Sequence, residues 1–420
     1  MKHGNSFPIL FPARRDRSTG GFRSPVFALR DSPLKKKNYF TFFFIAGSMS
    51  LQQLIVESSQ LLENQQPEQA VELLRSKLDQ FGESPLYLQT IGEAYLENGD
   101  VENAYQVLKK ACELDPNANE GVEKFLYLGQ IVGGRDGVQF LEIGVKKLLS
   151  QLELVQSESS QPLDESTQLL FAAYTEPDKV QEYLLKKLNQ GLFGIIEIWM
   201  TDLCMEPEAE EECEKCIQLA LSLDETNGES WSLLASIRIS QQKTQDARDA
   251  VKKAWDLFES KKTVLEDAAD PETQMEYIDL CQPLITLAKY AIETGLLELA
   301  TTIASSVQDI NEQSVESFYL EGFGYLLIAK RNQNGVSEQD GDKVAVAFDE
   351  YPLKQADDTV KEARLALTEA YKLLQVDSVV AETDADLVDT VMGLVTELGG
   401  PLFEKASKDE VDLDDLVDEE

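Results

Sequence analysis

Histidine is nearly absent from this sequence. The one histidine is His3, so residues 49–420 contain none. Histidine is the usual general base near neutral pH and a common nitrogen ligand for metals. The sequence also lacks a catalytic triad, a Walker loop and a dinucleotide fingerprint. We therefore predict no catalytic residues, no metal site, no cofactor and a function other than catalysis.

Cysteine is too scarce for a disulfide framework of the secreted type, and the five cysteines fall within helical patterns. Cys213 and Cys216 form a CxxC pair, for which zinc binding and redox chemistry are the functional alternatives. A zinc site needs about four ligands, and neither a second CxxC nor a histidine is present in the body of the chain. We interpret this pair as packing residues of a helix.

Long apolar runs are also missing. The longest, Tyr39–Ala46, is too short to span a bilayer.

The glycine-rich stretch Gly133–Gly137 has no following Lys-Ser/Thr pair and no preceding strand, so we expect a turn between helices and not a phosphate-binding loop.

Basic residues are few: 38 Lys and Arg face 76 Asp and Glu, which gives a net charge of −38. Residues 1–48 carry +7, from nine basic and two acidic side chains, so the remainder carries −45. A field of this size repels nucleic acid and anionic membranes and speeds encounter with basic partners. We expect no direct nucleic-acid partner and no membrane association.

Residues 1–48 differ from the rest in being basic, rich in Phe, Pro and Ser, and without helical periodicity. Three interpretations stay open: a start codon assigned too early, with Met49 as the natural start; a mitochondrial presequence; or a disordered extension. We expect the first, because Met49 leads directly into the first helical pattern.

A period of 34 residues organises the chain after Met49. Ala70 and Ala104 are 34 residues apart, as are Cys213 and Ala247. The clearest unit, residues 85–116, carries the residues of a tetratricopeptide repeat at the expected spacings, namely Leu88, Ile91, Gly92, Tyr95, Ala104, Leu108, Ala111 and Pro116. This pattern predicts an all-α fold, a tetratricopeptide-repeat superhelix of stacked helix pairs with an extended groove.

The predicted array covers residues 49–408. Its helix pairs include residues 50–80, 85–116, 123–152 and 193–223. Polar insertions are expected near residues 157–168 and 331–358, the second because Tyr325 and Ala363 are 38 residues apart where Tyr95 and Ala104 are 9 apart. A capping helix is expected around residues 386–398, followed by a disordered acidic tail over residues 409–420.

The groove of such an array is lined by the first helix of each pair. The expected groove positions are acidic, with Lys289 as the basic exception, and they are Glu93, Glu97, Glu123, Asp202, Glu206, Glu229, Glu293 and Glu316. We predict that these residues bind a partner rich in Lys and Arg. The alternative is that a very acidic protein simply places Glu on every surface.

The repeats, the late insertion, the segment SFYLEGFGYLLIAK (317–330) and the acidic end DEVDLDDLVDEE (409–420) together resemble the fungal assembly chaperones of large-subunit ribosomal protein four. The resemblance spans residues 49–420. It implies a dedicated chaperone, present in cytoplasm and nucleus, that shields the Lys/Arg-rich extension of newly made ribosomal protein four until it joins the pre-60S particle. The alternative is a general tetratricopeptide scaffold or co-chaperone in another complex.

Overall fold

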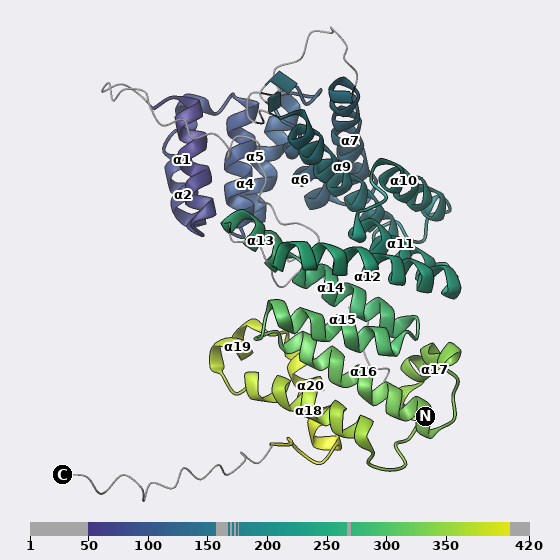
Figure 1. Ribbon diagram of the computed structural model, residues 1–420. Coiled ribbons are helices and arrows are strands. Elements are labelled where there is room, and N and C mark those ends of the chain that lie inside the picture. Colours follow the sequence, from purple (N-terminus) through teal and green to yellow (C-terminus); the bar gives the residue numbers. More distant parts are fainter. Residues whose placement is uncertain are drawn as a thin grey trace, which may run out of the picture. The chain divides into compact units, whose positions relative to one another are not determined.

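The computed structural model describes residues 49–156, 167, 168, 170, 171, 174, 176–266 and 270–403. Within these residues the chain forms helices and turns and no strand, which confirms the predicted all-α fold (Figure 1). The chain divides into two compact units, residues 1–263 and 264–420. The prediction of one array over residues 49–408 did not anticipate this division.

The first unit is a series of helix pairs. Each pair consists of two helices that are consecutive in the chain and joined by a short turn, with α3 as an additional short helix after α2. The helices are α1 (Leu51–Glu63), α2 (Pro67–Arg75), α3 (Leu78–Phe81), α4 (Pro85–Glu97), α5 (Val101–Leu114), α6 (Glu123–Val132), α7 (Gly134–Gln156), α9 (Pro177–Met200), α10 (Ala209–Leu223), α11 (Gly228–Ser240) and α12 (Thr244–Glu266), whose last residues enter the second unit.

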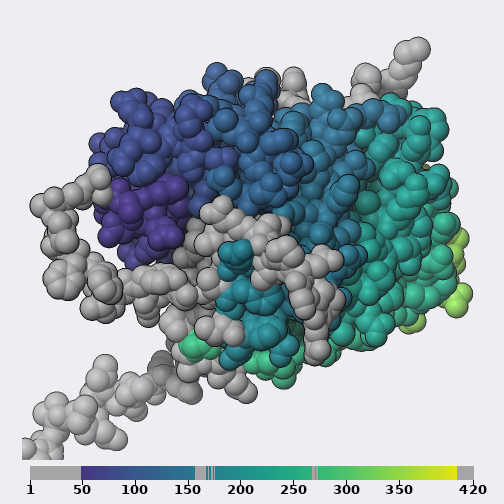
Figure 2. All heavy atoms as spheres, turned by 90° about the horizontal axis from the view of Figure 1, so that it is seen from above, coloured from purple at the N-terminus to yellow at the C-terminus, as the bar shows by residue number. Residues whose placement is uncertain are grey.

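Consecutive helices of the first unit pack on one another, both within pairs (α1 on α2, α4 on α5, α6 on α7, α9 on α10) and between them (α2 on α4, α5 on α6, α7 on α9, α10 on α11). Figure 2 shows this order across the upper part of the view, where the colours pass from purple through blue to teal. Contacts between chain neighbours are the property that defines a solenoid.

Local sequence signals fix the helix boundaries. Ser50 is the N-cap of α1 and forms a capping box. Its hydroxyl oxygen accepts a hydrogen bond from the backbone N–H of Gln53, and the side-chain oxygen of Gln53 accepts one from the backbone N–H of Ser50. Pro67 and Pro177 stand at the first position of α2 and α9, where a missing N–H costs nothing. Asp100 caps α5 by accepting from the N–H of Asn103.

Small residues let the two helices of a pair approach. A Cβ added at Gly92 would lie 2.6 Å from Leu108 Cδ2, so α4 and α5 meet as closely as the repeat pattern predicts. Ala70, Ala104 and Ala247 are fully buried, and Cys213 nearly so, which confirms that the 34-residue period marks packing positions.

Two boundary predictions in this unit are wrong. The turn expected over residues 133–137 is limited to Gly133, and α7 already begins at Gly134. The helix expected from residue 193 begins at Pro177, because Pro177 starts a helix of 24 residues that is longer than the standard repeat helix. Most of the insertion expected near residues 157–168 lies outside the described residues, as do residues 1–48 and the tail 409–420.

The second unit contains α13 (Pro271–Asp279), α14 (Cys281–Glu293), α15 (Leu297–Ile310), α16 (Val315–Gln333), α17 (Gly341–Val346), α18 (Asp358–Leu373), α19 (Asp377–Glu382) and α20 (Ala385–Glu397). Helix α16 is its centre and packs on α14, α15, α17 and α18. A Cβ at Gly322 would lie 2.7 Å from Leu367 Cγ, so α18 takes the place of the delayed second helix.

The stretch expected to be a polar excursion is folded. Between α16 and α18 it contains two 3₁₀ turns (Glu338–Asp340 and Phe348–Glu350) flanking α17. Lys330 donates a 3.1 Å hydrogen bond to the carbonyl of Phe348, and Asn334 donates one of 3.0 Å to the carbonyl of Pro352. These bonds hold the insertion against the end of α16. Helix α20 lies where the capping helix was expected and packs on α18.

Candidate functional site

Two of the expected groove residues, Glu93 and Glu123, are buried. Glu123 accepts hydrogen bonds from Tyr183 Oη, from Gln89 Nε2 at 3.0 Å and from the N–H of Val122 at 3.1 Å. Burial opposes its ionisation, but the charge of Lys187 and these hydrogen bonds outweigh that effect and hold the pKa of Glu123 below its usual value. The expectation that these two side chains are exposed is wrong: both are buried, and Glu123 contacts Gln89 of the preceding repeat and Tyr183 of the following one.

Asp202 and Glu206 do not lie on a first helix. Both belong to the connection between α9 and α10, and both contact the start of α7. Asp202 accepts a 2.9 Å hydrogen bond from the N–H of Gly134, and Glu206 forms a 2.7 Å ion pair with Arg135. The predicted placement is wrong because α9 ends at Met200, before either residue.

Two other expected residues of the first unit are exposed: Glu97 at the end of α4, and Glu229 in the first turn of α11. In the second unit, Glu316 pairs with Lys289 at 2.5 Å, and burial raises the pKa of Glu293. A binding role for these four residues stays a prediction.

The position that usually holds Tyr in a repeat holds Arg238 on α11. Its two terminal nitrogens donate to the two carboxylate oxygens of Glu214 on α10, at 2.6 and 2.9 Å. The hydrogen bonds from Arg238 hold the pKa of Glu214 below its usual value. A forked ion pair therefore joins two consecutive repeats at the position where the repeat pattern usually places Tyr.

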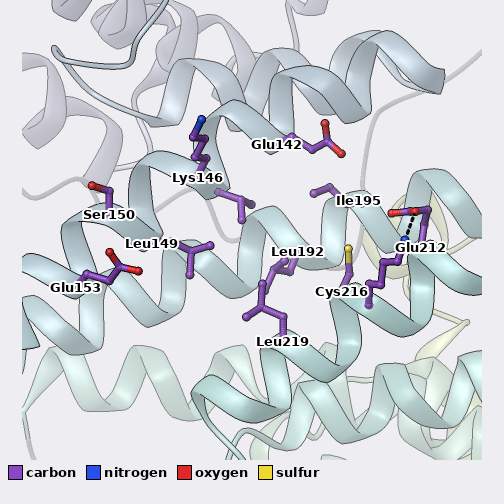
Figure 3. A pocket seen from close by; sticks show the side chains of 12 residues that line it. Glu142, Lys146, Leu149, Ser150, Glu153, Leu192, Ile195, Glu212, Cys216 and Leu219 are labelled. Carbon is purple, nitrogen blue, oxygen red and sulfur yellow. Dashed lines mark hydrogen bonds and ion pairs between the residues drawn. The ribbon is translucent and has the colours of Figure 1, made fainter.

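A groove of about 480 Å³ opens between α7, α9 and α10 (Figure 3). Helices α7 and α10 are the second helices of their pairs, whereas the expected acidic positions were placed on first helices. Apolar side chains from all three helices line it, among them Val145 and Leu149 from α7, Leu192 and Ile195 from α9, and Leu219 from α10. We call this the α7–α9–α10 groove.

Carboxylates stand at both ends of this groove. In Figure 3, Glu153 lies at one end, Glu142 and Glu212 lie toward the other, and Leu149, Leu192 and Leu219 lie between them. This arrangement could hold apolar side chains in the middle and cations at the ends.

The groove could not be predicted from the repeat pattern. Glu142, Leu149 and Glu153 all lie on α7, but only the packing of α7 with α9 and α10 shows that they line one groove.

The CxxC pair lies beside this groove without forming a chemical site. Cys213 is buried and Cys216 lines the groove; both thiols are free. Burial raises the pKa of Cys213 to about 11 and that of Cys216 to about 12. Such thiols are poor nucleophiles at neutral pH. Across the described parts of the chain, no three His, Cys, Asp or Glu side chains cluster as metal ligands would.

None of the helices in the described residues combines the length and apolarity that a membrane crossing requires.

The fold and these surfaces define a helical-repeat protein of the tetratricopeptide class. A tetratricopeptide-repeat family model matches residues 86–118, and a model described as the ACL4 C-terminal domain matches residues 313–414.

Curated relatives agree with these matches. A Schizosaccharomyces pombe protein named "Probable assembly chaperone of rpl4" is 32% identical over 258 residues, 60% of this chain and 67% of the relative. An Emericella nidulans protein of the same name is 28% identical over 66% of this chain and 65% of its own length. The chain thus spans about two thirds of each relative. It belongs to the family of fungal assembly chaperones of rpl4.

A solved structure titled "Assembly Chaperone of RpL4 (Acl4) (Residues 1-338)" has the same fold. It superposes with a TM-score of 0.54 at 24% identity, over 68% of this chain and 99% of that one. At this identity the likeness concerns the fold alone.

Proposed function

We propose that this protein is a dedicated chaperone that binds newly made large-subunit ribosomal protein four, shields its Lys/Arg-rich extension, and holds it for assembly of the pre-60S particle. The observation that carries the proposal is the relation to two proteins named as assembly chaperones of rpl4. In this role the protein acts by binding and not as an enzyme.

The electrostatics support this role. With a net charge of −38, the protein attracts Lys/Arg-rich segments and repels the nucleic acid that would otherwise capture them. Shielding therefore requires no chemistry. The client leaves when the assembling particle offers it more phosphate contacts than the chaperone offers carboxylates.

The test is capture of recombinant ribosomal protein four by the purified full chain at increasing salt. Affinity should fall steeply between about 0.1 M and about 1 M salt, because the screening length shrinks from roughly 10 Å to roughly 3 Å. Affinity that does not change with salt would contradict the electrostatic mechanism. Recovery of heat-shock proteins instead of one ribosomal protein from cells would favour the general scaffold.

A role in shielding during transport implies presence in both the cytoplasm and the nucleus, which is part of this proposal. Fluorescence microscopy of the tagged protein checks it. Exclusion from the nucleus under all growth conditions would limit the chaperone to the cytoplasmic stage.

A further inference from the structure

Two carboxylates on one face of α7 bracket the α7–α9–α10 groove. Glu142 and Glu153 are 11 residues apart, which corresponds to roughly 16 Å along a helix. Both side chains are exposed, and neither forms an ion pair with another described residue. They are therefore available to a cation from outside.

The basic residues at the groove do not neutralise these ends. Lys215 is held by two carboxylates of its own helix, Glu211 at 2.9 Å and Glu212 at 2.8 Å. Lys146 lines the groove, but Figure 3 shows its amino group extending away from the leucines. The groove thus presents free negative charge at its ends.

The middle of the groove is apolar and only partly covered. Leu149 and Leu219 are half-buried, and they line the groove together with Leu192 and Ile195, which are buried on α9. Covering these side chains with an apolar partner would remove apolar surface from water, the main driving force of association.

The groove walls are helices whose backbone groups are already bonded, so a partner cannot bind by adding a strand. The mode that fits is a helix laid into a groove with its apolar face down. The distance between Glu142 and Glu153 matches about three turns of such a helix.

We propose that the α7–α9–α10 groove is a second contact site for the client, distinct from the acidic positions on the first helices. It takes an amphipathic helical segment whose apolar face is flanked at both ends by Lys or Arg. Charge complementarity excludes an acidic segment, because its carboxylates would face Glu142 and Glu153. This inference rests on the proposed function, since the segment belongs to the basic client.

The first experiment uses a fluorescent peptide of about 15 residues with leucines on one helical face and lysines at both ends. Binding to the full chain is measured by anisotropy. One control peptide replaces the leucines with serine, and another replaces the lysines with glutamate. We expect binding of the first peptide only.

The second experiment compares charge reversals. The double variant Glu142→Lys/Glu153→Lys should weaken binding of the peptide roughly tenfold, because two attractions become repulsions. The matched control is Glu102→Lys/Glu113→Lys on α5, another second helix, where two exposed glutamates have the same spacing of 11 residues. The control should change binding less than about twofold. Ser150→Trp, which fills the groove without changing charge, should weaken binding as well.

These outcomes separate the two proposals. Equal losses in the groove and control variants, or binding of the serine peptide as tight as that of the leucine peptide, would overturn the groove site. If the wild-type chain captures ribosomal protein four and the groove variants capture it equally well, the chaperone role stands and the groove inference fails. If the wild-type chain does not capture it, the proposed function fails, and the peptide result alone decides the groove.

Discussion

Gln89 and Glu123, which occupy the same position in consecutive repeats, are hydrogen-bonded to each other. Gln89 Nε2 donates to a Glu123 carboxylate oxygen at 3.0 Å, and the two residues are 34 apart in the sequence. Gln89 Oε1 also accepts from the N–H of Lys124 at 3.2 Å. Gln89 of one repeat therefore positions the start of α6 in the next repeat. The 34-residue period thus separates two residues that are in direct contact.

Removing this buried carboxylate should destabilise the first unit. Glu123→Ala takes the acceptor from Tyr183 and Gln89 and a counter-charge from Lys187, which should cost about 3 kcal/mol in the free energy of unfolding. Glu97→Ala, on the exposed end of α4, should change it by less than about 0.5 kcal/mol. Urea denaturation of both variants measures the difference. A loss at Glu123 no larger than at Glu97 would mean that the buried contacts contribute nothing.

The same carboxylate predicts a pH dependence. Because the folded pKa of Glu123 is below its ordinary value of 4.5, its contribution to stability is complete above that value and is lost as the pH falls through the lowered one. Glu123→Gln should therefore be less stable than the wild type near pH 6 and should lose less stability on acidification to about pH 3. Parallel unfolding curves for the two proteins across this range would contradict this assignment.

Features that depend on residues close together in the sequence could be predicted from it, whereas features that depend on contacts between distant residues could not. The helix pairs could be predicted because small residues such as Gly92 and Ala104, at fixed spacings in the sequence, mark where two helices pack closely. The burial of Glu123 could not, since it depends on Tyr183, which is 60 residues away. The groove could not be predicted either, because it depends on where α9 lies. Helix α9 begins at Pro177, earlier than the 34-residue period indicates, and the expected acidic positions were assigned from that period.

Adding one methyl group at Gly92 should disrupt the pair α4–α5. The new Cβ would lie 2.6 Å from two carbons of Leu108, so Gly92→Ala should destabilise the protein by about 2 kcal/mol. The matched control is Gly393→Ala in the middle of α20, where no atom lies within 4 Å of the added Cβ. That change should stabilise the protein by about 0.5–1 kcal/mol through helix propensity. Thermal unfolding distinguishes the two. If the clash is with Leu108, the double variant Gly92→Ala/Leu108→Ala should lose less stability than the sum of the two single variants.

Cysteine reactivity should follow exposure and not the CxxC motif. Burial raises the thiol pKa of Cys112 and Cys216 to about 12 and that of Cys213 and Cys281 to about 11, whereas Cys204 is exposed. Alkylation of the folded protein near pH 8 should therefore modify Cys204 first, because only the thiolate reacts. Peptide mass spectrometry after short exposures identifies the order. Modification of Cys216 as fast as Cys204 would contradict it.

The insertion between α16 and α18 should depend on one buried lysine. Lys330 is 4% exposed; its amino group lies 3.3 Å from the centre of the Phe348 ring and donates to the Phe348 carbonyl. Burial lowers its pKa, although Glu397 and Asp349 oppose this shift.

Lys330→Met keeps the apolar stem but removes the donor and the cation. Hydrogen exchange should therefore accelerate in residues 338–350 while α18 stays protected, because α18 is held separately by the close packing of Gly322 on Leu367. Lys343→Met provides the control, since Lys343 is exposed and its ion pair is with Asp340, inside the insertion. If exchange rises equally in α18, the insertion and the last repeat unfold as one unit, and the lysine supports the whole end of the array and not the insertion alone.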